Sequence, residues 1–469
     1  MGFHHLILFA QQEPQATGTP WDLYIPFFGL HFLEFAIWGA WFVVLGNYLN
    51  ALGFSRKAIG RIYGTMALGA IFSPLFLGAV ADKYVNMEVV IGGSHLVGAL
   101  LLVVLSQMKR PWTFFAAALA YALVYSPTLS LVNAIVFANF ERVGQEPENF
   151  PYIRVFGTLG WIAAGMSLKL LVRPDRPMNN RPLMLAAGLS AILGIYSLLV
   201  LPATPPSAAD EASGAVVNQD ESALDTEAAG TSTAEEIHPL RKVFLLMTVP
   251  SSAVFLLVSL VIAMAMGFYF AFAALFVEQR AGVRAQNVGP MMTIGQWVEI
   301  IFMLSLPWFI RALGMPVVLT LGVTAWALRF AFFSYGKSFA LILAAIALHG
   351  ICFDFFFAAG FIHIENLAPR DIRASAQSLY GVIVYGLGMY LGTEISGWLN
   401  QRFTKEVATA VKVEGEPPQR ATDWNRFWLV PCIGVTVALI LFIASLFVVT
   451  DPAIPEIDPG TAPQAEAAP

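Results

Sequence analysis

The chain has 469 residues, of which 57% are hydrophobic and only 12% are charged. Soluble domains carry about 25% charged residues, so this composition excludes an ordinary soluble protein and predicts an integral membrane protein. The net charge of −5 comes mostly from the tails and a linker, and no basic block that would bind nucleic acid is present in the sequence. The two cysteines, Cys352 and Cys432, lie in apolar runs, which predicts buried thiols rather than a disulfide or a metal site.

Twelve apolar stretches are long enough to cross a bilayer as helices. Six precede and six follow a long polar segment, which is the layout of a two-halved transporter. We therefore expect an all-α integral membrane protein with twelve transmembrane helices in two six-helix halves, residues 24–202 and 245–450. The expected spans are 24–50, 59–81, 88–107, 113–139, 152–172, 182–202, 245–276, 288–310, 315–334, 338–363, 374–399 and 427–449.

The remaining segments are polar. Residues 203–244 link the two halves, and the part from 203 to 237 holds eight acids and no Lys or Arg. A segment of this composition cannot bury a core, so we expect a disordered, cytoplasmic linker. We interpret residues 1–23 as a cytoplasmic tail and the Pro/Ala-rich residues 451–469 as a disordered tail.

Three polar side chains stand out within the spans of the second half. Asp354 lies near the middle of span 338–363 among four phenylalanines. A carboxylate at that depth is costly unless it is paired, hydrated or protonated, so it is a candidate for function. Gln296 and Glu299 lie one helical turn apart and would present an amide beside a carboxyl. They could bind a polar ligand together or form a purely structural pair.

The first span carries His31, Glu34, Trp38 and Trp41 at the spacing i, i+3, i+7 and i+10. This spacing places all four on one helix face. A stripe with one acid and two indoles favours a face that looks into a cavity. The alternative is that the tryptophans only pack and that Glu34 forms a fixed structural pair.

The fifth span places Arg154, Thr158 and Trp161 on one helix face. Arg154 either enters the interior or extends to the membrane interface. Arg329 and Glu394 are also deep in predicted spans, and either one could form an ion pair that locks one conformation.

Motifs of common enzymes are missing from the sequence. It contains no Gly-x4-Gly-Lys-Ser/Thr phosphate loop, no Gly-x-Ser-x-Gly elbow and no His-Glu-x-x-His zinc motif. We therefore expect neither ATP-driven pumping nor an enzyme, and no cofactor.

Several short motifs, from the first span to the eleventh, together resemble the major facilitator superfamily. More closely, the chain is similar to the nucleoside:proton symporters, the bacterial nucleoside permease family. The matching stretches are 38–41, 78–83, 127–129, 153–158, 296–299, 328–331, 353–356 and 372–377. The resemblance implies that five residues line a nucleoside site: Arg154, Thr158, Gln296, Glu299 and Asp354.

The chain departs from that family at four positions that bear on the ligand. Met266 and Tyr269 stand where the family has Gln and Asn. His349 replaces a Tyr, and Glu34 replaces a Gln. These departures concern which substrate is carried rather than the fold.

The orientation rests on the resemblance. With both termini in the cytoplasm, the inner loops hold seven Lys and Arg residues and the outer loops fifteen. The positive-inside rule alone would favour the opposite orientation. The stretch 78–83, however, resembles a motif that the superfamily places in the cytoplasmic loop after the second span. We therefore expect both termini inside.

The sequence predicts a monomeric, multi-pass secondary transporter of the bacterial inner membrane that imports nucleosides with protons by alternating access. Aromatic faces would hold the base, and we expect them from Trp38, Trp161, Tyr269 and Phe353. Burial makes an acid easier to protonate, so the candidates for proton coupling are Asp354, Glu299 and Glu34. Glu34 and Asp354 would border one cavity and titrate together. The alternatives are a transporter of another small polar solute, such as a sugar, and a non-transporting nutrient sensor on the same fold.

Overall fold

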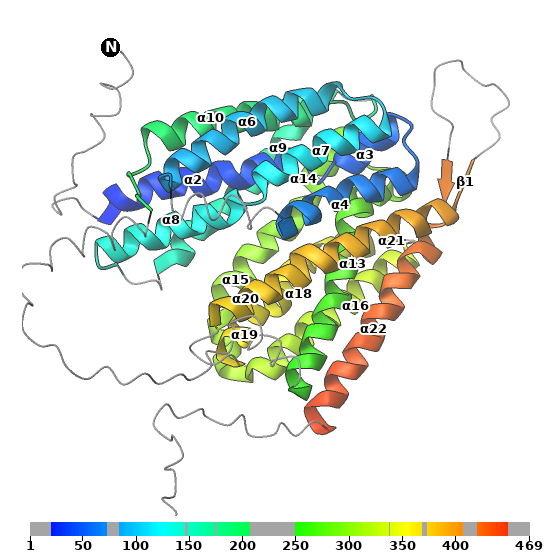
Figure 1. Ribbon diagram of the computed structural model, residues 1–469. Coiled ribbons are helices and arrows are strands. Elements are labelled where there is room, and N and C mark those ends of the chain that lie inside the picture. The colour runs from blue at the N-terminus through cyan, green and yellow to red at the C-terminus, as the bar shows by residue number, and fades with distance from the viewer. Residues whose placement is uncertain are drawn as a thin grey trace, which may run out of the picture.

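The computed structural model describes residues 20–72, 84–145, 149–173, 176–206, 249–336, 338–367, 373–406 and 420–448. Figure 1 shows two helical halves that follow one another along the chain. The first half contains α2 (Pro20–Trp41), α3 (Leu45–Ala51), α4 (Arg56–Phe72), α6 (Met87–Gln107), α7 (Pro111–Tyr125), α8 (Thr128–Arg142), α9 (Phe150–Leu171) and α10 (Arg181–Leu199).

The second half contains α13 (Pro250–Ala281), α14 (Ala285–Met292), α15 (Ile294–Leu313), α16 (Met315–Tyr335), α17 (Phe339–Ala347), α18 (His349–Cys352), η4 (Phe353–Ala358), α19 (Ala359–Leu367), α20 (Arg373–Gly381), η6 (Val382–Gly388), α21 (Met389–Arg402) and α22 (Trp424–Val448). Two short strands, β1 (Thr404–Glu406) and β2 (Arg420–Thr422), pair antiparallel before α22. The sequence did not predict this pair of strands.

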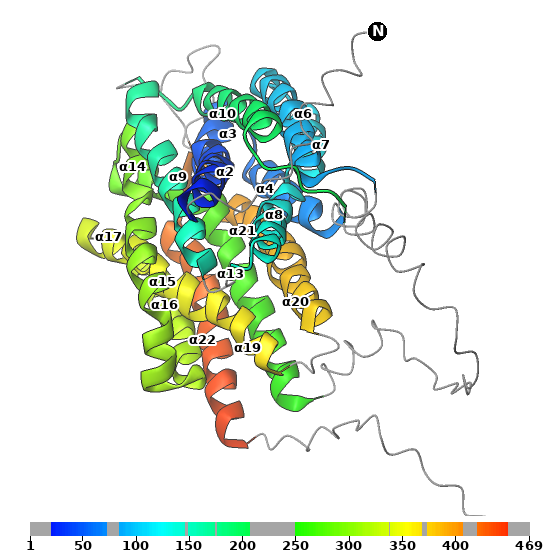
Figure 2. The same ribbon diagram turned by 90° about the vertical axis from the view of Figure 1, so that its left-hand side faces the viewer.

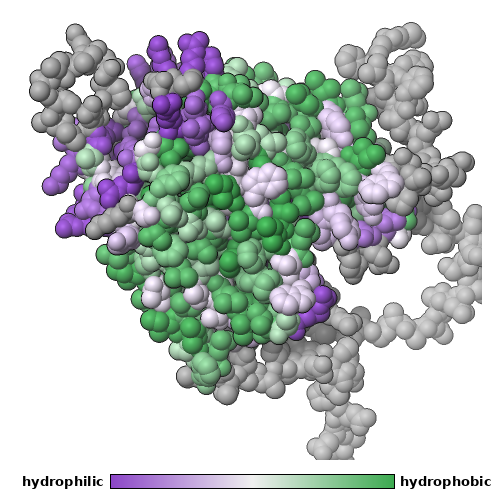
Figure 3. Space-filling view, turned by 180° about the vertical axis from the view of Figure 1, so that it is seen from behind, coloured by the Kyte–Doolittle hydropathy of each residue, from purple (hydrophilic) through white to green (hydrophobic). Residues whose placement is uncertain are grey.

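Every expected span contains helix, and the prediction of a helical membrane protein in two halves is confirmed. Within the described residues, nine continuous helical stretches are long and apolar enough to cross a membrane. The other three expected spans, 59–81, 152–172 and 374–399, are occupied by α4, by α9 and by the series α20, η6 and α21. Large apolar side chains cover much of the outer surface, and hydrophilic residues gather towards one end, as Figure 3 shows.

Several spans are interrupted where they bend. The fourth span ends α7 at Tyr125 and resumes as α8 at Thr128, with Pro127 at the break. This is expected because proline lacks an N–H and clashes with the preceding turn. The tenth and eleventh spans each contain a π-helical segment, η4 and η6. Such segments are rare and are frequently found at functional sites.

The halves meet along a limited set of helices. In the first half α2 packs on α9, and α6 packs on α10; in the second half α16 packs on α22. Between the halves, α4 lies along α21, and α9 lies along α14. Figures 1 and 2 show both pairs side by side. The ligand-binding candidates of α9 and α15 therefore lie where the two halves face each other.

Some predicted features lie outside the described residues. They are the stretch 78–83, the linker from 207 to 244, residues 1–19 of the amino-terminal tail and the tail 451–469.

Candidate functional site

A direct contact joins the candidate residues of the two halves. The hydroxyl of Thr158, on α9, donates a hydrogen bond to Oε1 of Glu299, on α15, at 3.3 Å. Both side chains are buried. Trp161, one turn after Thr158, lines a small cavity together with Tyr269 of α13 and Gln296 of α15. The structure thus brings Thr158 of the fifth span and Glu299 of the eighth into contact between the halves, and Gln296 lines the cavity.

Arg154 enters the same region from α9. Its guanidinium lies over the ring of Phe35, 4.2 Å from the ring centre. Its charge interacts with the carboxyls of Glu299 and Asp354, so its side chain turns inward rather than to the membrane interface. In the part of the chain that the structure describes, Nη1 of Arg154 has no hydrogen-bond partner. This nitrogen is therefore a donor that a ligand could use.

Asp354 lies in the π-helical segment η4 and is only 1% exposed. Its Oδ2 atom has no hydrogen-bond partner among the described residues, and neither has Oε1 of Gln296. Buried polar atoms are normally paired, and each exception needs an explanation. Together with Nη1 of Arg154, these two acceptors could form hydrogen bonds with a polar ligand.

The aromatic candidates fall into two groups. Trp161 and Tyr269 line the cavity. Trp38 packs edge-on against Trp161 with ring centres 5.4 Å apart, and Phe353 lies 5.8 Å from the ring of His349. Trp38 and Phe353 therefore support the residues around the cavity, whereas Trp161 and Tyr269 offer their own surfaces to it.

Arg329 and His349 contact each other beside the site, which the sequence did not predict. Both Nη atoms of Arg329 lie within 3.3 Å of Nδ1 of His349. The guanidinium also lies over the ring of Tyr269, 3.6 Å from its centre. Among the described residues Arg329 has no carboxylate partner within ion-pair distance, so it does not form the ion pair that its depth suggested. The change from Tyr to His at position 349 was the only signal of this arrangement.

Glu34 has partners within its own half. The side chain is completely buried, with His95 Nε2 of α6 at 2.7 Å from its Oε2 atom. The Thr128 hydroxyl of α8 donates to Oε1 at 2.8 Å. No contact between Glu34 and Asp354 is present in the described chain. The structure therefore does not bring together the two acids that we expected to share a cavity.

The other residues of the first-span face also point to different neighbours. His31 Nε2 lies 3.2 Å from the amide oxygen of Asn133, and the ring of Trp41 packs edge-on against Tyr121. Of the four residues on this face, Trp38 is the one that contacts an aromatic residue of the cavity.

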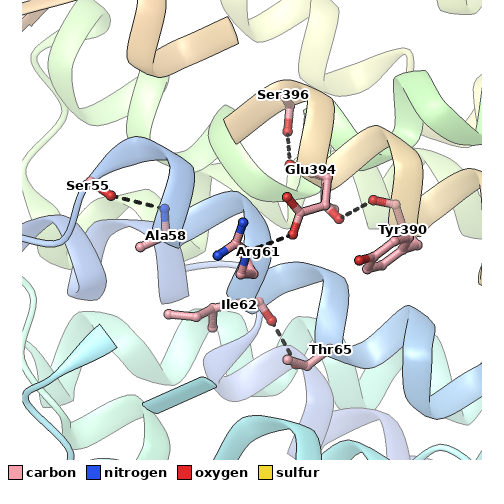
Figure 4. A network of polar contacts seen from close by, with 9 residues as sticks. Ser55, Ala58, Arg61, Ile62, Thr65, Tyr390, Glu394 and Ser396 are labelled. Carbon is pink, nitrogen blue, oxygen red and sulfur yellow. Dashed lines mark hydrogen bonds and ion pairs between the residues drawn. The ribbon is translucent and has the colours of Figure 1, made fainter. Parts of the chain in front are cut away.

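Polar contacts also join the halves on the far side of the site from the chain termini. Arg61 of α4 and Glu394 of α21 form an ion pair of 3.2 Å, which Figure 4 shows in its surroundings. Asn47 of α3 donates to Glu278 of α13 at 2.5 Å. Glu394 thus forms an ion pair, one of the alternatives that the sequence left open, and its side chain is 23% exposed rather than deep in the membrane. The halves are thus closed against each other at this end.

Comparisons with known proteins match nearly the whole chain. The family model described as nucleoside H+ symporter covers residues 23–451. The putative nucleoside transporter YegT of Escherichia coli is 33% identical over 88% of this chain and 91% of its own length. The xanthosine permease of Escherichia coli is 30% identical over 86% of this chain and 90% of its own length.

Solved structures agree with these sequence matches. The crystal structure of the nucleoside transporter NupG has a TM-score of 0.72 and 28% identity, and covers 91% of this chain and 99% of its own. A bacterial homologue of the human lysosomal transporter Spinster, in an inward-facing and unoccupied conformation, has a TM-score of 0.65 at 13% identity. At this low sequence identity, the similarity to the Spinster homologue supports the fold alone.

Proposed function

Because this chain belongs to the nucleoside H+ symporter family, we propose that it imports nucleosides together with protons by alternating access. The observation that carries this proposal is the contact between Thr158 and Glu299. It joins polar groups of both halves close to a small cavity lined by Trp161, Tyr269 and Gln296. A nucleoside needs hydrogen-bond partners for its sugar and flat apolar surfaces for its base, and this boundary supplies both.

Each residue of the site has a proposed role. Gln296 and Glu299 bind the sugar hydroxyls, and Arg154 and Thr158 complete the polar side. Trp161 and Tyr269 contact the base, with Trp38 and Phe353 packed behind them. The acids proposed for proton coupling are Asp354 and Glu299, because Glu34 lies within its own half in contact with His95 and Thr128. Asp354 is supported best, because it combines burial with an oxygen that has no partner in the described chain.

We further propose that the protein works as a monomer in the bacterial inner membrane, with both termini in the cytoplasm. In this orientation, the contacts of Arg61 with Glu394 and of Asn47 with Glu278 lie on the periplasmic side. The described conformation then corresponds to a transporter that is closed to the periplasm. Alternating access requires these contacts to break when the opposite state forms.

The experiment that tests this function is ligand-dependent thermal stabilisation of the purified protein. A ligand that binds only the folded protein raises its melting temperature in proportion to the logarithm of its concentration. We expect nucleosides to stabilise the protein, and free bases and free sugars to do so much less. Stabilisation by sugars without nucleosides would contradict the proposal and favour a sugar-like substrate.

A further inference from the structure

The contacts of Arg329 with His349 determine which nitrogen of the imidazole carries the proton. Arginine only donates hydrogen bonds. Since both Nη atoms of Arg329 approach Nδ1 of His349, at 3.2 and 3.3 Å, Nδ1 must accept. The hydrogen of the neutral ring therefore sits on Nε2. Both side chains are buried, so water does not compete for these groups.

The Nε2–H group is directed at the substrate site. Nε2 of His349 lies 3.6 Å from Oε2 of Glu299, whose other oxygen accepts the bond from Thr158. This distance is slightly longer than a hydrogen bond. A small movement of either side chain would bring the two atoms within hydrogen-bond distance. His349 is thus placed to hold the second oxygen of Glu299.

The ring of His349 is itself held in place. It stacks on Tyr269 with ring centres 5.6 Å apart and an angle of 21° between the planes. The helix α15 also passes close by, since a Cβ atom at Gly295 would lie 2.7 Å from Cβ of His349. A ring confined in this way can orient a neighbouring carboxylate.

We propose that His349 is a positioning residue that orients the Glu299 carboxylate for the substrate's hydroxyls, and that Arg329 sets the tautomer of His349 that makes this possible. This inference rests on the proposed function. It adds two residues of the second half to the site and gives the histidine a single direction of action. With Nδ1 occupied by Arg329 and Nε2 protonated, His349 donates to Glu299 and takes no proton from it.

Two substitutions of His349 separate this role from a purely structural one. In His349→Asn the amide oxygen stays near the position of Nδ1 and still accepts from Arg329, but the side chain is too short to reach Glu299. In His349→Gln the amide nitrogen lies near the position of Nε2 and donates to Glu299. Each variant therefore keeps one of the two contacts of His349 and loses the other.

The measurement is nucleoside affinity by counterflow and by ligand-dependent thermal stabilisation, together with the melting temperature without ligand. We expect affinity to fall roughly fivefold to a hundredfold in His349→Asn, and clearly less in His349→Gln. If His349 only satisfied Arg329, the order would be reversed, with Asn tolerated and Gln not. That order, or equal affinities in both variants, would overturn the proposal.

A third substitution tests the tautomer. In Arg329→Met the donor to Nδ1 is lost, so the proton of His349 is free to move to Nδ1 and the contact with Glu299 weakens. We expect affinity to fall in Arg329→Met, and to fall much less when the same change is made in His349→Gln, whose amide needs no partner to donate. An equal loss in both backgrounds would overturn the role of Arg329.

The wild-type protein distinguishes this inference from the function on which it rests. Wild-type protein that binds no nucleoside would overturn both proposals. Wild-type protein that binds nucleosides, with His349→Asn binding them equally well, would overturn only the positioning role.

Discussion

At the scale of single residues, the buried acids differ in the groups that lie next to them. Glu34 accepts a hydrogen bond from Thr128 at one oxygen, and His95 Nε2 lies 2.7 Å from the other. Asp354 and Gln296 each keep one acceptor without a partner in the described chain. An unpaired buried acceptor costs free energy, and a bound ligand or proton would offset that cost. We therefore expect substitutions of Asp354 and Gln296 to affect transport or binding, and a substitution of Glu34 to affect mainly stability.

The first prediction concerns Asp354→Asn. Asparagine keeps the size of the side chain but can neither bind nor release a proton. We expect uptake driven by a proton gradient to fall to background, while exchange of labelled nucleoside without a gradient persists. Transport assays in proteoliposomes, with and without an imposed gradient, measure both. Gradient-driven uptake at the wild-type rate would remove Asp354 from the coupling pathway.

The second prediction concerns Gln296→Ala. The substitution removes an amide that lines the cavity and lies one turn from Glu299. Losing one partner of a buried polar contact lowers affinity roughly fivefold to a hundredfold. Competition binding to the folded variant measures this change. Unchanged affinity would show that the sugar hydroxyls bind elsewhere.

The third prediction concerns Glu34→Gln. The amide oxygen can still accept from Thr128, but the close contact with His95 loses its charge. We expect a loss of stability on the order of 1–3 kcal/mol and little change in the pH dependence of uptake. The measurements are the melting temperature and the normalised uptake profile from about pH 5 to 8, a range that includes the usual titration of histidine. A displaced profile at unchanged stability would instead place the pair of Glu34 and His95 in the proton pathway.

At the scale of elements, glycines allow helices of the two halves to touch. Gly60 of α4 faces α21 so closely that a Cβ atom would overlap the backbone oxygen of Thr393 and approach Cα of Gly397 to 2.7 Å. Backbone cannot move aside as a flexible side chain can. The contact of α4 with α21 therefore depends on the missing side chain at this position.

The fourth prediction is that Gly60→Ala opens the contact between α4 and α21. We expect the distance between spin labels at Ser55 and Arg402 to increase, and the rate of uptake to fall. Gly93→Ala on α6 is the matched control, because a Cβ atom there meets nothing within 4 Å. An unchanged label distance in Gly60→Ala, or an equal effect in both variants, would contradict this account.

At the scale of the whole molecule, two halves joined at one end form the described state. The ion pair of Arg61 with Glu394 spans them, and its side chains are 44% and 23% exposed. An exposed pair contributes about 0–1 kcal/mol. A transporter that must open again benefits from contacts of this size, because a stronger bond would hold one state too firmly.

The fifth prediction concerns this ion pair. Arg61→Glu places two acids next to each other and should shift the population away from the closed end by up to about fivefold. The double variant Arg61→Glu with Glu394→Arg should restore it. Distance distributions between the labels at Ser55 and Arg402 report the populations. A double variant that stays as open as the single one would show that the pairing itself does not matter.

Much of the architecture followed from composition and periodicity. Long apolar runs must become helices in lipid, where the backbone has no water to bond with, and the acidic segment between the sixth and seventh runs marked the division into halves. One-turn spacing on a single helix also placed Gln296 beside Glu299, and Arg154 on the same face as Thr158 and Trp161. These relations lie within one helix, so the sequence by itself determined them.

Contacts between helices were decided only by the tertiary structure. The sequence shows that Glu34 and Asp354 are buried acids but not which helix packs against each one. The fold turns Glu34 towards His95, a residue 61 positions away, and turns Arg329 towards His349 rather than towards an acid. The physical reason is that a buried polar group takes whichever partner the packing of neighbouring helices brings within hydrogen-bond distance, and that packing depends on the whole chain.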